Sequence, residues 1–422
     1  MKTILYCVAL IAVALPGFAG PQSEGGDGSI TVLTNRTDLV DNVFVEYAER
    51  FATAYPDFSV EFEAMTDYPG IVRIRMNTED YGDVLLIPPT ITPQQLPQFF
   101  TPLGSVAELD QDFLGVTEMA YEGVTYGIPV SINAQGVVYN RRIWREAGVT
   151  ELPRTPEQFL EALRMIRDNT DAIPYYTNYA AGWPLVQWEN HRTSIAGDSN
   201  FVNSLVHTDA PFAPGQPHYI LYQLMYDIVA QGLAEEDPTT TDWESSKVRL
   251  NNGEIATMIL GSWAIPQMQD AGPNAADIGY MPFPSNIDGQ VFAAAGGDYK
   301  MGINVHSEDQ EAARAFVTWF ATETGFAVAT GGIPPYRAEA MPDVLRAFQD
   351  LGVQFVSNDP PRPGEEGLLE EIDRIGEIGL WEPNFKARIV EAALGNRDES
   401  FDQIMNDLNE RWAAARREVL GQ

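Results

Sequence analysis

Cysteine is almost absent from this sequence. The single cysteine, Cys7, lies in an apolar run close to the amino terminus. Residues 1–19 have the features of a secretory signal peptide, because Lys2 precedes that run and small residues follow it. We expect cleavage after Ala19, which leaves a mature chain without a thiol, a disulfide or a cysteine metal site. Cys7 comes too early to be the lipid-bearing cysteine of a lipoprotein, so we expect a free periplasmic protein.

Basic residues are also few. The chain has 26 Lys and Arg against 60 Asp and Glu, and only four of the basic residues are lysine. The formal net charge of −34 repels nucleic acid and anionic membranes, so we expect neither as a partner. The acidic residues are scattered along the chain. This pattern fits a protein adapted to saline surroundings, where salt screens the repulsion, and fits an ordinary acidic exported protein equally well.

Catalytic and cofactor motifs are missing. The four histidines stand in no metal-binding spacing, and no nucleophile elbow, dinucleotide fingerprint or Walker sequence occurs. We therefore expect no cofactor, no metal and no enzymatic activity. A secreted glycoside hydrolase stays open as an alternative, because so acidic a chain offers carboxylate pairs at many spacings.

The hydrophobic pattern predicts an α/β fold. At 422 residues the chain is too long for one core, so we expect two domains. Strands are expected over residues 29–34, 58–64 and 83–87, with an amphipathic helix between the first two, an order that indicates a parallel sheet. A glycine-broken strand is expected over residues 293–303, and a helix after an N-cap at Thr155.

Tryptophan gives the strongest functional signal. Four of the eight tryptophans fall in loop-like stretches beside polar residues: Trp183, Trp188, Trp263 and Trp381. An indole ring stacks on the C–H face of a pyranose, while neighbouring amides and carboxylates bind its hydroxyls, so this set favours a carbohydrate site. For any one of these rings taken alone, core packing is the better explanation, so the argument for a sugar site rests on the set. The other four lie on expected helices and are assigned to packing: Trp144, Trp243, Trp319 and Trp412.

Polar residues follow the expected strands, and open α/β sheets bind ligands beyond the carboxyl ends of their strands. The candidates are Asn35, Arg36, Asp38, Asp67, Tyr68, Asn133, Gln135, Gly296, Gly297 and Asp298, to which we add Tyr336. They contain no cluster of like charge, which favours a neutral sugar over a polyamine or a peptide. Competing interpretations are a helix cap for Asp38, turn roles for Arg36 and Asn133, a hinge at the two glycines and packing for Tyr336.

Several segments resemble one protein family, in the family's order. Residues 123–129 (G-V-T-Y-G-I-P) and the V-Y-N that ends at Asn140 are similar to its G-x-x-Y-G-(I/L)-P and Y-Y-N passage. Residues 252–263 resemble its G-x-A-A-M-x-x-x-G-x-W pattern, and residues 81–86 its (P/G)-D-V strand. On these motifs the chain is identified as a member of the extracellular solute-binding proteins of ABC importers, in the carbohydrate-binding, maltose-binding-protein-like group.

The resemblance implies two α/β lobes joined by crossing hinge strands. By position, a flexible leader of residues 20–28 would precede lobe one, made of residues 29–131 and 299–331. Lobe two would comprise residues 132–298 and 332–422. The resemblance also implies a monomer that closes on a mono- or oligosaccharide and then docks on permease subunits.

The resemblance also assigns roles to site residues. Asn35 and Asp38 would contact sugar hydroxyls from the loop after the first strand, and Asn133 would sit at the first crossover. Trp183 and Trp263 would stack on sugar rings. Pro88 stands where maltose-binding protein has a tryptophan, so neither a stacking surface in lobe one nor specificity for long maltodextrins carries over.

Overall fold

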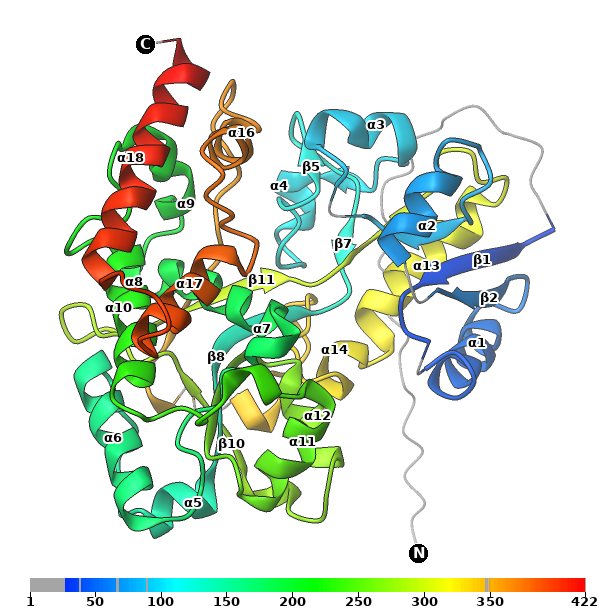
Figure 1. Cartoon of the computed structure of the whole chain (residues 1–422). Helices are drawn as coiled ribbons and strands as arrows, with labels where there is room; N and C mark the ends of the chain where they lie inside the picture. Colours follow the sequence, from blue (N-terminus) through cyan, green and yellow to red (C-terminus); the bar gives the residue numbers. More distant parts are fainter. Residues whose placement is uncertain are drawn as a thin grey trace, which may run out of the picture.

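The computed structural model describes residues 27–421, except residues 38, 66, 67, 89, 346, 347 and 349. The expected signal peptide and nearly all of the expected leader lie outside these residues. Figure 1 shows two halves with strand segments passing between them. We call the half around the amino-terminal sheet lobe one and the other half lobe two. No helix in the described part of the chain is long and apolar enough to cross a membrane.

Lobe one is built on a sheet of five strands in the order β2-β1-β3-β12-β7. Its strands are β1 (Ser29–Thr34), β2 (Ser59–Ala64), β3 (Val84–Leu86), β7 (Ile128–Pro129) and β12 (Lys300–Ile303). β1 runs parallel to β2 and β3, while β12 is antiparallel to β3 and β7. The three strands expected from the first part of the sequence are therefore confirmed, and two strands from later in the chain complete the sheet.

Helices cover this sheet through apolar faces at helical spacing. The largest are α1 (Val43–Ala54), α2 (Tyr68–Arg75) and α13 (Gln310–Glu323), with α14 (Phe326–Ala329) after them. Phe51 on α1 packs edge-on against Phe316 on α13, with ring centroids 5.3 Å apart. Smaller elements complete the lobe: α3 (Leu96–Phe99), α4 (Val106–Leu109), and the sheet of β4 (Gly104–Ser105), β5 (Ala120–Tyr121) and β6 (Val124–Thr125).

Lobe two is built on the long strand β8 (Ile132–Asn140). β8 lies between β10 (Ile278–Pro282) and β11 (Phe292–Gly297) and also pairs with β9 (Thr257–Gly261), while β13 (Gln354–Val356) extends the sheet beyond β11. The helices are α5 (Arg141–Glu146), α6 (Pro156–Asn169), α7 (Trp183–Val186), α8 (His191–Ala196), α9 (Phe201–Ser204), α10 (Pro217–Ala230), α11 (Trp243–Asn252), α12 (Ala264–Asp270), α16 (Leu368–Ile375), α17 (Asn384–Ala393) and α18 (Phe401–Leu420).

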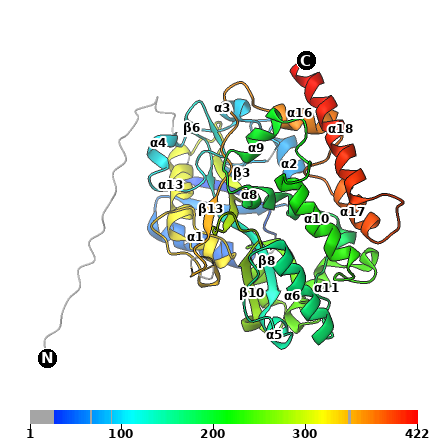
Figure 2. The same cartoon turned by 90° about the vertical axis from the view of Figure 1, so that its left-hand side faces the viewer.

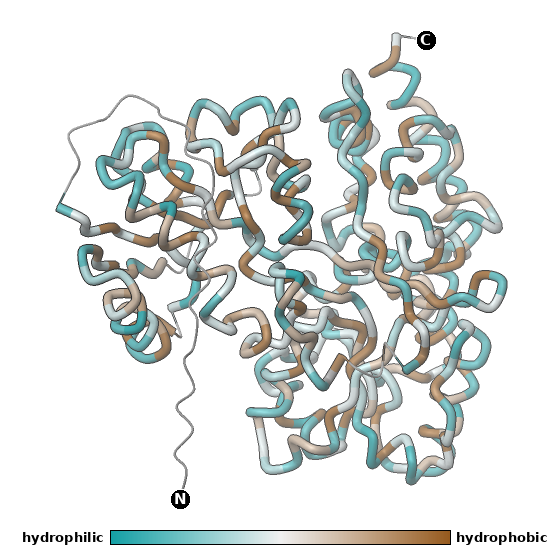
Figure 3. Tube along the Cα trace, turned by 180° about the vertical axis from the view of Figure 1, so that it is seen from behind, coloured by the Kyte–Doolittle hydropathy of each residue, from teal (hydrophilic) through white to brown (hydrophobic). Residues whose placement is uncertain are grey.

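The carboxyl-terminal helices belong to lobe two. Figures 1 and 2 show α17 and α18 beside α10, with α16 beside α18, and their apolar residues share one buried cluster with α6 and α10. Figure 3 shows hydrophobic and hydrophilic stretches alternating along the helices, as expected for elements with one buried face. The expected N-cap is confirmed, because the Thr155 hydroxyl accepts from the backbone N–H of Gln158 at the start of α6.

Two antiparallel segments connect the sheets. The glycine-broken strand expected at residues 293–303 is two strands, β11 in lobe two and β12 in lobe one, with the break at Asp298 and Tyr299. At the break, the backbone N–H of Asp298 donates to the Ser131 carbonyl at 2.8 Å, and that of Val130 donates to the Tyr299 carbonyl at 3.0 Å. A third segment of the chain, at Ile333, lies beside the first of these two segments in the chain. Ile132 and Ile333 exchange backbone hydrogen bonds of 2.9 and 2.7 Å.

The buried apolar side chains separate along the same lines. One apolar cluster takes its buried members from residues 30–130 and 301–326. The other two clusters take theirs from residues 132–415 and include no residue from 301–326. The residue ranges expected for the two lobes stay a prediction, and this partition of the core supports them.

Candidate ligand-binding site

The larger of two neighbouring cavities has a volume of about 280 Å³ and lies beside the crossing strands in lobe two. Its polar lining consists mainly of carboxamide side chains, which both donate and accept hydrogen bonds. The polar and aromatic lining residues are Asn133, Gln135, Gln187, Asn190, Arg192, Thr193, Trp263, Asp298 and Asn358. The Oε1 atom of Gln135 is buried and has no hydrogen-bond partner in the described part of the chain. Such a lining suits a neutral, hydroxyl-rich ligand.

Three tryptophans gather at one side of this cavity. The Trp183 ring centroid is 4.8 Å from that of Trp243 and 5.7 Å from that of Trp263, and the latter two are 5.9 Å apart. Trp183 is 36% exposed, and Trp263 lines the cavity. The ring of Trp263 folds back over Gly261, where a Cβ would lie 2.5 Å from its Nε1. We call the three rings the tryptophan cluster; through Trp263 it gives the cavity an aromatic surface beside its amides.

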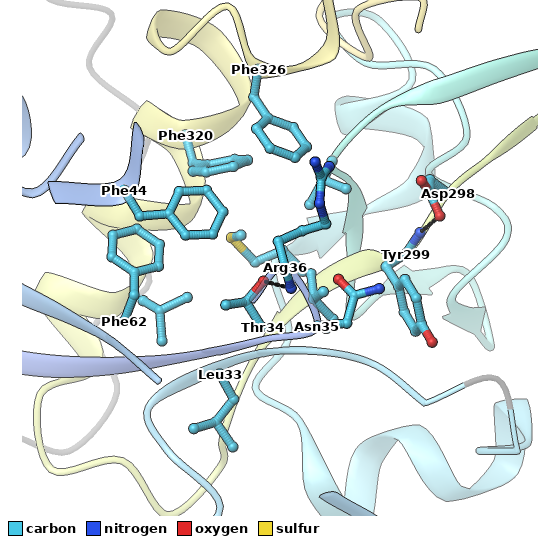
Figure 4. Close-up of a pocket in the computed structure, with 14 residues that line it drawn as sticks. Leu33, Thr34, Asn35, Arg36, Phe44, Phe62, Asp298, Tyr299, Phe320 and Phe326 are labelled. Atoms are coloured by element: carbon cyan, nitrogen blue, oxygen red, sulfur yellow. Dashed lines mark hydrogen bonds between the residues drawn. The ribbon is translucent and has the colours of Figure 1, made fainter. Parts of the chain in front are cut away.

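The smaller cavity, about 50 Å³, lies in lobe one at the end of β1. Figure 4 shows four phenylalanine rings on one side of it, with Arg36 in the centre and Asn35 and Asp298 toward the other side. Asn35 and Arg36 come from the loop after β1, whereas Asp298 comes from the break between β11 and β12. Asp298 lines both cavities, so the crossing strands bring the two sites to a common border.

The two glycines at the end of β11, Gly296 and Gly297, differ in their surroundings. A Cβ at Gly296 would meet no atom within 4 Å, so the backbone of β11 is open on that side. Gly297 is enclosed, because its N–H donates to Glu118 Oε1 at 2.7 Å and its carbonyl accepts from Lys300 Nζ at 2.9 Å. Lys300 also pairs with Glu118 at 2.6 Å. Gly296 therefore offers open backbone to the cavity, while Gly297 is held by an ion pair at the crossing.

Comparison with known proteins decides the family. The chain matches the sequence model of the family described as bacterial extracellular solute-binding protein over residues 38–325. It belongs to that family. A curated relative, the multiple sugar-binding protein of Streptococcus mutans, is 21% identical over 311 residues, covering 71% of this chain and 73% of the relative. The expected family and fold class are thereby confirmed.

Solved structures extend the comparison to nearly the whole chain. BlMnBP1, a binding protein of an ABC transporter from Bifidobacterium animalis subsp. lactis solved with mannobiose, is 38% identical, with a TM-score of 0.83, over 92% of this chain and 95% of that one. BlMnBP2, a manno-oligosaccharide specific solute binding protein of the same organism solved with mannotriose, is 37% identical, with a TM-score of 0.83 and the same coverage.

The fold of this solute-binding protein brings together eight of the expected site residues. The larger cavity is lined by Asn133, Gln135, Trp263, Gly296, Gly297 and Asp298, while Asn35 and Arg36 line the smaller one. Trp183 joins through the tryptophan cluster. Asp38 and Asp67 lie outside the described residues, so their roles stay predictions.

The expectation for Trp188 is wrong. Its side chain is 1% exposed, its Nε1 donates to the Tyr175 hydroxyl at 3.0 Å, and it packs within the main core of lobe two. The short turn Gln187–Asn190 points Gln187 and Asn190 at the cavity and directs Trp188 and Glu189 inward. The indole is thus a core residue and offers no face to a sugar.

Tyr68 and Tyr336 are also corrected. Tyr68 is fully buried, and its hydroxyl accepts from the Leu86 N–H at 2.7 Å and donates to the Leu86 carbonyl at 2.9 Å. It ties α2 to β3. Tyr336 packs against Phe113 with ring centroids 5.6 Å apart and lines neither cavity, so the packing interpretation holds for it.

Five polar lining residues were missed by the sequence analysis: Gln187, Asn190, Arg192, Thr193 and Asn358. Gln187, Asn190 and Thr193 recur every third residue, which was the available signal. Arg192 is 1% exposed and donates from Nη1 to Glu189 Oε1 at 2.9 Å. Its guanidinium carbon lies 4.7 Å from the ring centroid of Trp381, which is 49% exposed. Trp381 therefore lies over a buried arginine that lines the cavity, but it does not line the cavity itself.

A buried polar cluster supports that arginine. Glu189 is fully buried and accepts hydrogen bonds from Arg192, from His218 Nε2 at 2.8 Å and from the Tyr222 hydroxyl. Burial acts to raise the pKa of the Glu189 carboxyl, but the attraction of His218 and Arg192 outweighs it and holds that pKa well below its usual range. Glu189 is thus an ionised anchor beneath the cavity wall.

His191 gives a prediction about acid stability. The ring is fully buried, stacks on Phe283 at 4.5 Å, and neither nitrogen has a hydrogen-bond partner in the described part of the chain. Burial lowers its pKa from 6.5 to about 3, so between those values only the unfolded chain gains the proton and stability falls as pH falls. H191F is expected to raise the free energy of unfolding by about 1–2 kcal/mol at pH 7.

The same variant separates the acid effect from the packing effect. Its advantage over the natural protein is expected to grow by about 2 kcal/mol between pH 7 and pH 5, because phenylalanine has no proton to bind. Urea denaturation at the two pH values measures both quantities. If the difference in the free energy of unfolding between the two proteins were the same at both pH values, His191 would bind its proton in the folded protein as it does in the unfolded chain.

Proposed function

We propose that this protein binds a manno-oligosaccharide of two or three units and delivers it to the permease of an ABC importer. It is a carbohydrate-binding component of such an importer. The observation that supports this best is the amide-lined cavity beside the tryptophan cluster, at the border of two lobes. The sugar class is taken from BlMnBP1 and BlMnBP2, whose structures hold mannobiose and mannotriose and which match 92% of this chain.

The geometry suggests how a sugar would be held. Trp263 and Trp183 would stack on pyranose faces, while Asn133, Gln135 and Asn190 would bind hydroxyls from lobe two. Each such hydrogen bond contributes about 1 kcal/mol net. Asn35 and Arg36 would complete the site from lobe one.

Ligand binding would also drive closure. Because Asp298 lines both cavities, a sugar at this border meets both lobes most fully when they approach, and it therefore favours the closed form. The crossing strands, with their break at Asp298 and Tyr299, are the natural hinge.

Location and partners follow from the family. As a member of an extracellular solute-binding family, the protein acts outside the cytoplasm. We infer in addition that the mature chain is a free periplasmic monomer, cut from a signal peptide after Ala19. Its closed form would dock on the permease subunits.

The test is a ligand screen on the mature protein. Thermal unfolding with mannobiose, mannotriose, maltotriose, spermidine and a tripeptide is expected to show stabilisation by the two mannosides alone. A ligand at 100 times its Kd adds about 2.7 kcal/mol to the free energy of unfolding. Stabilisation by maltotriose alone would change the sugar class, and stabilisation by spermidine or the peptide alone would refute a sugar site.

The hydrolase alternative is tested in the same samples. The family is one of binding proteins, so mannotriose is expected to be recovered intact by chromatography after prolonged incubation. Release of mannose or mannobiose in proportion to protein concentration would instead identify a glycosidase.

A further inference from the structure

Lys386 is a fully buried lysine on α17, close to the wall of the larger cavity. Its ammonium makes no direct ion pair in the described part of the chain but donates to three backbone carbonyls. These belong to Gly379 at 3.0 Å, to Leu380, and to Glu382 at 2.9 Å. An ammonium has three N–H donors, so each one has an acceptor. Burying a charge is costly unless its hydrogen bonds are satisfied, and here all of them are used on one turn.

That turn contains Trp381. Its ring covers the guanidinium of Arg192, which lines the cavity. The turn also lies close to Gly182, the residue before Trp183, because a Cβ at Gly182 would lie 3.5 Å from Pro383. The three carbonyls bound by Lys386 thus lie on either side of the one residue of the turn whose ring covers Arg192.

The charges around Lys386 come from several elements. Carboxylates face it from Glu189, from Asp373 on α16 and from Glu382, whereas Arg192 on α8 opposes its charge. His218 and Tyr222 on α10 are bonded to Glu189. Burial lowers the pKa of the Lys386 ammonium to about 8, with the carboxylates acting against that shift.

We propose that Lys386 is a positioning residue for sugar binding: its ammonium fixes the Trp381 turn against Arg192 and so sets the affinity of the larger cavity. The inference rests on the proposed function, since sugar is taken as the ligand. Arg192 is restrained between Glu189 and an indole, so the part of the cavity wall that it forms is held in one position. Loosening the turn frees both side chains, and ordering them again costs binding free energy.

A purely structural lysine gives a different expectation. If Lys386 only stabilised α17, its loss would lower stability and leave the effect of Trp381 on sugar binding unchanged. If it acts through Trp381, the two substitutions must be coupled. A double-mutant cycle therefore separates the two roles.

The cycle uses K386M, W381A and the double variant, with calorimetric titration of mannotriose at pH 7. K386M and W381A are each expected to raise the Kd on the order of tenfold, and the double variant no further than W381A alone. R388M is the matched control, because Arg388 lies on the same helix but pairs with Glu399 and Asp407. Effects of K386M and W381A that multiply, or an equal rise of Kd in R388M, would overturn the inference.

A pH profile tests the proposal even if K386M does not fold. The neutral amine keeps two N–H donors, so one carbonyl of the turn loses its partner above about pH 8. The Kd of the natural protein is expected to rise several-fold between pH 7 and 9.5, and that of W381A to stay flat. Between pH 8 and 10.5 only the unfolded chain holds this proton, so the contribution of this group to stability rises with pH, and a weaker affinity there does not come from a less stable fold. Parallel profiles in both proteins would refute the role of Lys386.

A ligand-free measurement keeps this inference separate from the proposed function. The emission of Trp381 is the difference between the fluorescence of the protein and that of W381F. It is expected to shift to longer wavelength in K386M, as the ring leaves Arg192, and to stay unchanged in R388M. If no sugar binds, the proposed function fails while this shift still supports the positioning role. An unshifted difference spectrum would contradict it.

Discussion

Replacing Trp263 with alanine is expected to weaken mannotriose binding on the order of a hundredfold. Trp263 is the one member of the tryptophan cluster that lines the larger cavity, and its ring lies against Trp183 and Trp243. Truncating a central aromatic residue in a binding site costs about 2–4 kcal/mol, because its contact area and the exclusion of water are lost together. Calorimetric titration of the folded variant measures the loss.

Two further substitutions identify the cause. W243A removes a ring of the same cluster that does not line the cavity, so its effect on the Kd should be much smaller. G261A keeps the indole but places a Cβ where Nε1 lies, which displaces the ring, and it should therefore weaken binding as well. Wild-type affinity in W263A would remove the tryptophan cluster from the site.

Much of the fold could be predicted because it follows from local pattern. β1 coincides with the run expected at residues 29–34, and the capped helix begins after Thr155 as the sequence predicts. Gly296 and Gly297 end β11 and mark the approach to the break at Asp298 and Tyr299, where one continuous segment changes sheet. Asp298 follows a strand end as the sequence predicts, whereas Asn133, expected after a strand, lies within β8.

The candidate site was less predictable where it depends on which way a short turn faces. Gln187–Asn190 is a turn of four residues, too short for a periodicity to show which side chains point inward. Trp188 was therefore taken for a surface ring. Trp243 was assigned to helix packing, yet it begins α11 and joins the tryptophan cluster through a contact distant in sequence.

The buried charged cluster around Glu189 could not be predicted from the sequence either, because its members come from elements that are distant in the chain. Glu189 and Arg192 are close in the chain, but His218 and Tyr222 come from α10 and Lys386 from α17. In the sequence, Glu189 is one of 60 acidic residues and has no distinguishing neighbour. Only the tertiary fold shows that it is an anchor for the cavity wall.

The second large effect concerns that anchor. E189Q is expected to lower the free energy of unfolding at pH 7 by about 3–5 kcal/mol, because it leaves Arg192 buried without its bonded counter-ion. E399Q is the matched control. Glu399 pairs with Arg388 at a partly exposed site, where such pairs contribute about 1 kcal/mol or less. Denaturant unfolding of the three proteins gives both differences, and equal losses in the two variants would contradict an anchoring role for Glu189.

The pH dependence and a compensating substitution test the electrostatic origin of this loss. The pKa of Glu189 is lowered in the folded protein, so its contribution is complete above the unfolded value of 4.5 and is lost as pH falls toward the folded value. The difference between natural protein and E189Q should therefore be constant from pH 8 to 5 and shrink in stronger acid. Adding R192M to E189Q removes the uncompensated cation and should recover part of the stability, whereas simple additivity would mean that the two side chains stabilise the fold independently.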